Sequence, residues 1–69
     1  MGIFGVEERN PIFKIKKAKD NEYYFVLFAK NGEKIATSEM YTSKENCKNG
    51  IESVKKNAPL AVINDTTEK

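Results

Sequence analysis

Hydrophobic and polar residues alternate with a period of two along residues 12–19 (IFKIKKAK). Phe13 and Ile15 fall on one side of this segment, and Lys14 and Lys16 fall on the other. Such alternation is typical of a β-strand that has one face buried and the other in water. The pattern therefore predicts a half-buried first strand.

A strongly hydrophobic stretch, residues 23–29 (YYFVLFA), predicts a second strand. Its residues favour strands, and apolar side chains occur on both of its faces, as expected of a central strand. Residues 20–21 (DN) before it are turn formers. Asn31-Gly32 after it is typical of a hairpin, because both residues tolerate positive φ. Residues 33–39 (EKIATSE) then form the third strand of an antiparallel sheet.

The hairpin leaves two registers open, because a slip of one residue exchanges the two faces of a strand. A two-residue turn at Asn31-Gly32 puts Phe28 opposite Ile35, whereas a three-residue turn with its glycine in a bulge puts Leu27 opposite Ile35. We favour the second register, with a similar turn at residues 20–22, because it gathers one compact apolar face. That face would hold Phe13, Ile15, Phe25, Leu27, Ala29 and Ile35, with Lys14, Lys16 and Lys34 on the other face.

Apolar residues recur at helical spacing in the second half of the chain and predict one amphipathic helix. Thr42-x-x-Glu45 matches a capping box, so we expect the helix to begin near Ser43. Asn57 is expected to take a left-handed cap, and Pro59 to stop the helix from continuing. The apolar side of this helix contains Cys47, Gly50, Ile51, Val54 and Ala58.

Gly50 is an unusual residue for the middle of that apolar side. A glycine inside a helix costs about 0.5–1 kcal/mol relative to alanine, so a compensating contact is expected. The simplest compensation is that the missing side chain lets the helix backbone lie close to the sheet.

Residues 60–63 (LAVI) predict a fourth strand, which gives the order β-β-β-α-β and an α+β fold with one helix packed on an antiparallel sheet. We expect a flexible N-terminal arm over residues 1–11, one domain over residues 12–63 and a polar tail over residues 64–69. A chain of 69 residues is only marginally stable alone. With one cysteine and no histidine, neither an internal disulfide nor a common zinc site is available, which favours a homodimer.

The composition gives little indication of a chemical activity. The net charge of +2 is too small to imply nucleic acid by itself. No run of about 18 apolar residues could span a membrane, and the first residues are too acidic for a signal peptide. A lone cysteine fits the reducing cytoplasm. No residue pattern indicates a cofactor, a metal or a catalytic set, so we expect a protein that is not an enzyme.

One sheet face is a candidate binding surface. Basic and aromatic residues interleaved on a sheet are a common way to hold single-stranded nucleic acid. The alternative, which we favour, is a solvated face on which lysine stems cover apolar surface. In the favoured register this face contains Lys14, Lys16, Lys34, Tyr24, Val26 and Phe28.

The other candidates have structural interpretations that we favour. Asn31, Gly32 and Glu33 suit an exposed binding tip, but a turn explains the first two. Ser38, Glu39 and Tyr41 suit a polar ligand, but the serine and tyrosine can also tie the loop to the sheet edge. Cys47 suits a reactive thiol, but on an apolar helix side it is more often a small buried hydrophobe.

The residues of the second and third strands and of the helix resemble the YegP-like family of small bacterial domains. The resemblance extends from about residue 12 to residue 63. Its motif is Phe25-x-Leu27-x-Ala29-x-Asn31-Gly32-Glu33-x-Ile35, then Ser38-Glu39-x-Tyr41, then Gly50-Ile51-x-Ser53-Val54 and Asn57-Ala58.

This resemblance implies a β-β-β-α-β unit that occurs as a tandem repeat or as two subunits. The two units share one sheet and exchange their C-terminal strands, so a chain with one unit is expected to form a homodimer with residues 60–63 exchanged. The family implies no biochemical activity. We therefore expect a structural, accessory or protein-interaction module, with weak binding of nucleic acid as the alternative.

Overall fold

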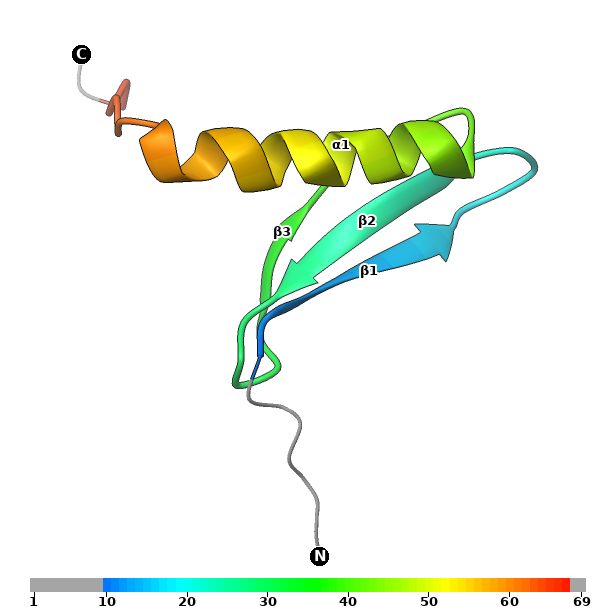
Figure 1. Ribbon diagram of the computed structural model, residues 1–69, viewed down its shortest axis with the longest axis horizontal. Helices are drawn as coiled ribbons and strands as arrows, with labels where there is room; N and C mark the ends of the chain where they lie inside the picture. Colours follow the sequence, from blue (N-terminus) through cyan, green and yellow to red (C-terminus); the bar gives the residue numbers. More distant parts are fainter. Residues whose placement is uncertain (1–9, 68–69) are drawn as a thin grey trace, which may run out of the picture.

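The computed structural model describes residues 10–67 and shows an α+β domain (Figure 1). Strands β1 (Ile12–Lys17), β2 (Tyr23–Phe28) and β3 (Lys34–Thr37) form an antiparallel sheet in the order β1-β2-β3. Helix α1 (Lys44–Asn57) lies across one face of this sheet. The fold class and the first four elements predicted from the sequence are therefore confirmed. Residues 1–9 of the predicted N-terminal arm lie outside the described residues.

The pairing of β1 with β2 sets the two faces of the sheet. Phe13 lies opposite Leu27 and Ile15 lies opposite Phe25, on the face that meets the helix. The connecting turn places Asn21 at a φ of 57°, a left-handed conformation that asparagine tolerates better than most residues. The predicted faces are correct, because this pairing differs from the predicted one by two residues and an even shift keeps every side chain on its face.

A bulge separates the turn after β2 from the rest of the β2–β3 pairing. Gly32 has a φ of 89°, and Phe28 lies opposite Lys34, as a three-residue turn requires. The register then shifts, so that Leu27 lies opposite Ala36. The predicted pairing of Leu27 with Ile35 is wrong, because the bulge leaves Ile35 as an additional residue on β3, 59% exposed.

Helix α1 begins one residue later than a cap at Thr42 would place it. Ser43 is the N-cap, with φ −152° and ψ 157°, and its side chain accepts a hydrogen bond of 3.0 Å from the backbone N–H of Asn46. The predicted capping box with Glu45 is therefore wrong. A serine directly before the helix offers the same oxygen as the threonine, and the backbone places this oxygen within reach of the third helical N–H.

The end of α1 also differs from the prediction. Asn57 keeps a right-handed conformation, with φ −93°, and its side-chain amide donates to the carbonyl of Ser53 at 2.8 Å. The chain continues into one 3-10 turn, η2 (Ala58–Leu60), with Pro59 in its first positions. No left-handed cap is needed, because Ala58 donates its N–H to Val54 O and Ala61 donates to Ala58 O.

The core forms where α1 crosses the first two strands. Among residues 10–67, the buried ones are Phe25, Val26 and Cys47. The Phe25 ring meets the edge of Phe13 at 5.6 Å and 76°, and it stacks on Tyr41 at 6.2 Å and 17°. Aromatic pairs of this kind add about 0.5–1.5 kcal/mol beyond burial, so the Phe25 ring is central to the small core.

Gly50 faces Tyr41, which follows β3. A Cβ on Gly50 would lie 2.7 Å from Cζ of Tyr41 and closer still to its hydroxyl oxygen. The close approach inferred from the sequence is therefore present, but the helix meets a tyrosine ring and not the backbone of a strand.

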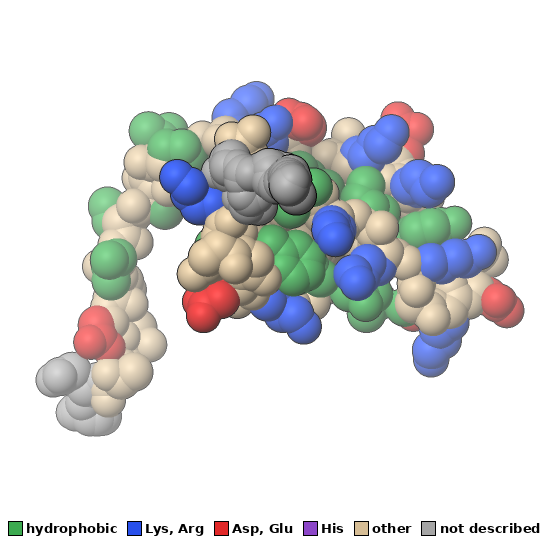
Figure 2. Space-filling model, turned by 90° about the horizontal axis from the view of Figure 1, so that it is seen from below, with side chains coloured by type: hydrophobic (Ala, Val, Ile, Leu, Met, Phe, Trp, Pro, Cys, Tyr) green, Lys and Arg blue, Asp and Glu red, His purple; other side chains and the backbone are tan. Residues whose placement is uncertain are grey.

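The C-terminal segment leaves α1 away from the sheet (Figures 1 and 2). Residues 61–67 have no regular secondary structure, so the fourth strand predicted at residues 60–63 is not formed in the single chain. Leu60, Val62 and Ile63 are 80%, 86% and 97% exposed. The physical reason is the direction of the chain, because η2 continues outward from the end of the helix.

Candidate functional site

The six residues predicted as a binding face lie together on the side of the sheet opposite α1. Cross-strand pairing puts Lys14 opposite Val26, Lys16 opposite Tyr24 and Lys34 opposite Phe28. Figure 2 shows lysine side chains among hydrophobic side chains on this side of the molecule. We call the surface formed by these six residues the open face. Whether it binds a ligand stays a prediction.

The open face is a basic surface over an apolar layer. Its three lysines are exposed, whereas Tyr24 and Phe28 are half-buried. The Nζ atom of Lys14 lies 5.4 Å from the centre of the Phe28 ring, close enough for a cation–π contact. Val26 is 2% exposed although it lies on the side of the sheet away from α1, so it offers almost no surface to a ligand in the single chain.

The candidate residues of the β2–β3 turn have structural roles. The side-chain oxygen of Asn31 accepts a hydrogen bond of 3.0 Å from the N–H of Glu33, which is an Asx turn. Gly32 supplies the positive φ, and Ala29 donates its N–H to the carbonyl of Glu33 at 2.8 Å. Glu33 itself is exposed. The turn thus accounts for Asn31 and Gly32, as the structural interpretation expects.

Ser38 and Tyr41 hold the segment between β3 and α1 against the central strand. The Ser38 hydroxyl accepts a hydrogen bond of 2.9 Å from the N–H of Phe25 and donates one of 2.7 Å to the carbonyl of Glu39. Tyr41 exchanges two backbone hydrogen bonds with Tyr23, at 2.9 and 2.7 Å. These contacts match the interpretation in which serine and tyrosine tie the loop to the sheet. Glu39 is exposed and contributes its carbonyl.

Cys47 is fully buried on the inner side of α1. Burial raises the pKa of its thiol above the ordinary value of 9.0. The chain has no histidine that could take the proton of the thiol. The nucleophilic thiolate is therefore disfavoured, and the side chain acts as a small hydrophobic group.

This shift in the pKa of Cys47 predicts a pH dependence of stability. The folded state holds the thiol proton more tightly than the unfolded state, so the contribution is complete below pH 9.0 and is lost as the pH rises toward the folded pKa. The loss approaches about 1.4 kcal/mol per pH unit. Between pH 8 and 10, the free energy of unfolding measured in urea should fall more steeply with pH for the natural chain than for Cys47→Ala. Parallel pH profiles would contradict the prediction.

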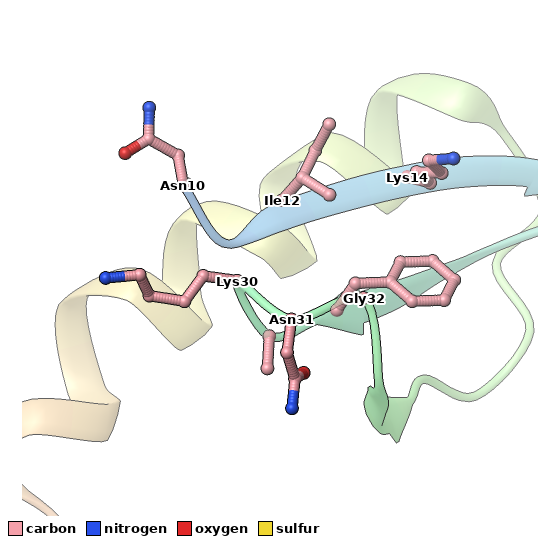
Figure 3. Close-up of a pocket in the computed structure, with 8 residues that line it drawn as sticks. Asn10, Ile12, Lys14, Lys30, Asn31 and Gly32 are labelled. Carbon is pink, nitrogen blue, oxygen red and sulfur yellow. The ribbon is translucent and has the colours of Figure 1, made fainter. Parts of the chain in front are cut away.

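A groove of about 440 Å³ opens at one end of the open face (Figure 3). The start of β1 forms one side, and the β2–β3 turn forms the other. We call it the turn groove. It is lined by Asn10, Ile12, Lys14, Phe28, Ala29, Lys30, Asn31 and Gly32.

Sequence reasoning placed only part of the turn groove. The sequence pattern places Lys14 and Phe28 on the open face, and Asn31 and Gly32 in the turn, as two separate candidate sites. Ile12 could have been added, because it lies opposite Phe28 in the register of β1 with β2. Asn10 and Lys30 gave no signal, since each stands in a segment where turn residues are ordinary.

Within residues 10–67, no three acidic, cysteine or histidine side chains are grouped so that they could hold a metal ion. No helix in the described part of the chain has the length and hydrophobicity needed to cross a membrane.

The fold and the site together define a small α+β domain with one helix on an antiparallel sheet and a basic open face. A family model described as a domain of unknown function, DUF1508, matches residues 18–65. Because the match covers most of the chain, the chain belongs to this family. The YegP-like resemblance inferred from the motif is confirmed by the relatives that follow.

These relatives fall into two lengths. The chain is 55% identical over 47 residues to the UPF0339 protein YegP of Yersinia pestis, which covers 68% of this chain and 42% of that protein. It is 55% identical over 51 residues to a UPF0339 protein of Treponema denticola, which covers 74% of this chain and 88% of that protein. The chain thus spans less than half of YegP but nearly all of the shorter relative.

A solved structure has the same fold. The NMR solution structure of a protein from Haloferax volcanii is similar with a TM-score of 0.74 and 36% sequence identity. The similarity covers 84% of this chain and 98% of that chain.

Proposed function

We propose that this protein is a homodimeric structural, accessory or protein-interaction module without enzymatic activity. In the dimer, residues 60–63 of each subunit add a strand to the sheet of the other subunit. The observation that carries this proposal is the exposure of Leu60, Val62 and Ile63, at 80%, 86% and 97%, on a segment that leaves the domain. The reducing cytoplasm suits the free thiol of Cys47 and is the compartment that we propose.

The energetics favour burial of this segment. A fully buried valine, leucine or isoleucine side chain contributes about 1.5–3 kcal/mol relative to an exposed one. The sheet also has two edge strands, β1 and β3, whose outer backbone groups can pair with an added strand. Exchange between two copies is symmetric, so the same contact forms twice in a closed dimer.

The lengths of the relatives support two units acting together. YegP of Escherichia coli is matched over 43% of its length, which leaves room for a second unit in the same chain. The match covers 88% of the shorter relative of Treponema denticola, which leaves room for one unit in that protein. A homodimer of the short form would provide two units by association.

Sedimentation equilibrium on the full chain and on a chain that ends at Ala58 tests the proposal. We expect a dimer for the full chain at micromolar concentration, and a monomer or an unfolded protein for the shortened chain. A full chain that sediments as a monomer would refute the exchange. A shortened chain that remains a dimer would show that another surface mediates association.

A second function is favoured by the open face, on which three exposed lysines surround half-buried Tyr24 and Phe28. We propose single-stranded nucleic acid as the ligand, because lysines can neutralise phosphates while aromatic rings stack on bases. Titration with a labelled oligothymidylate at several salt concentrations tests it. Binding should weaken as salt rises, and a lack of binding at low salt would remove this function.

A further inference from the structure

The turn groove brings together residues from two sequence motifs that are far apart in the chain. Lys14 and Phe28 extend the open face into the groove, whereas Asn31 and Gly32 come from the turn whose geometry fixes the other wall (Figure 3). The groove is thus the place where the open face ends in a concave site that stays open to solvent. A ligand that lies along the open face would reach its deepest contact here.

The residues that line the groove favour a ligand with both an apolar part and a charged part. Ile12, Phe28 and Ala29 form an apolar part, and the basic residues Lys14 and Lys30 also line the groove. Among residues 10–67, the side chains that line the groove include no carboxylate, so the charge of this part of the lining favours an anion. The ligand therefore needs a flat apolar portion next to a negative group, and a nucleotide has both.

Phe28 and Lys14 have the relative position that such a ligand requires. The Lys14 amine lies over the ring, 5.4 Å from its centre, so a base that stacks on this face must displace the amine, which can then contact the phosphate beside the base. The side-chain amide of Asn10 can hydrogen-bond with the edge of a base. The side-chain oxygen of Asn31 is already used by Glu33, which leaves the amino group of Asn31 as a donor.

We propose that the turn groove binds one nucleotide unit of a single strand, with the base on Phe28 and the phosphodiester held by Lys14 and Lys30. This inference rests on the nucleic-acid function proposed for the open face. It adds a defined subsite to a surface that would otherwise bind the backbone at any point.

Fluorescence anisotropy with a labelled oligothymidylate tests the subsite. Phe28→Leu keeps an apolar side chain but removes the stacking ring, and we expect roughly tenfold weaker binding. Tyr24→Leu is the control for a ring on the same face outside the groove and should have a smaller effect. Lys30→Gln should reduce the slope of log K against log salt by about the amount expected for one phosphate contact. Lys19→Gln, in the β1–β2 turn, should leave this slope unchanged.

The outcomes separate the subsite from the general function. If Lys16→Gln and Lys34→Gln weaken binding while Phe28→Leu and Lys30→Gln do not, the open face binds nucleic acid and the subsite is wrong. If the oligothymidylate does not bind at all, both the nucleic-acid function and the subsite are wrong. The NMR chemical shift of the Gly32 amide should change as oligothymidylate is added. If it changes only with protein concentration, the groove contacts a second copy of the chain, and the proposal is wrong.

Discussion

Gly50→Leu should lower the free energy of unfolding by about 2–4 kcal/mol, because a side chain at this position overlaps Tyr41. The Tyr41 ring cannot move aside freely. It is stacked on Phe25 at 6.2 Å, and its backbone is paired with Tyr23. The better helix propensity of leucine offsets only about 0.8 kcal/mol of this loss. Urea unfolding followed by circular dichroism gives the measurement.

Asn49 offers a matched control for the same helix. It is exposed, so the difference between Asn49→Gly and Asn49→Ala reports helix propensity alone, about 0.5–1 kcal/mol in favour of alanine. At position 50 the order should reverse, and Gly50→Ala should be less stable than the natural chain. If alanine stabilises both positions equally, the contact between Gly50 and Tyr41 does not limit the packing of this helix.

Val62→Asp should dissociate the dimer proposed above. In the exchanged arrangement Val62 is buried in a shared core, and a charge there loses the apolar contribution and is also desolvated. Together these effects amount to about 3–6 kcal/mol per subunit and about 6–12 kcal/mol per dimer, which corresponds to a dimer roughly ten-thousandfold weaker or more. Sedimentation at a series of concentrations gives the dissociation constant.

Thr66→Asp is the control for Val62→Asp, because it adds the same charge to the same tail outside residues 60–63. It should leave the dissociation constant unchanged. In a chain whose tail stays exposed, Val62→Asp would also change stability by less than about 0.5 kcal/mol. Equal behaviour of the two variants would therefore refute the burial of residues 60–63.

The turns show which features could be predicted from neighbouring residues and which could not. Asn31-Gly32 predicts a turn because both residues tolerate positive φ, and in the structure Gly32 has a φ of 89°. The bulge at Ile35 gave no such signal. Nothing in the order of residues after the turn marks an additional residue, since the bulge depends on how β3 must bend to reach β2.

The helix shows a similar division. Its length and inner side follow from the spacing of apolar residues, and Cys47 is buried as that spacing indicates. Its cap was misplaced by one residue, because Thr42 and Ser43 offer the same chemical group and only the path of the backbone selects Ser43. Sequence reasoning also expected Gly50 to approach the sheet, but the fold placed Tyr41 there.

The candidate site, too, could be predicted only in part from the sequence. The alternation of Lys14 and Lys16 with Phe13 and Ile15 was enough to assign the lysines to one face. The turn groove was not predictable in this way, because it joins the start of β1 to a turn about twenty residues away, and only strand pairing brings these segments together.

The sequence by itself determined the three strands and the helix of the sheet domain, which side chains of β1 and β2 share a face, and the need for a left-handed glycine in the β2–β3 turn. These properties depend on residues that are neighbours in the chain or follow its local period. Tertiary structure alone decided the bulge at Ile35, the contact of Gly50 with Tyr41, the turn groove and the outward direction of residues 61–67. Each of these depends on how distant segments meet, and the energy of such contacts is absent from any local pattern.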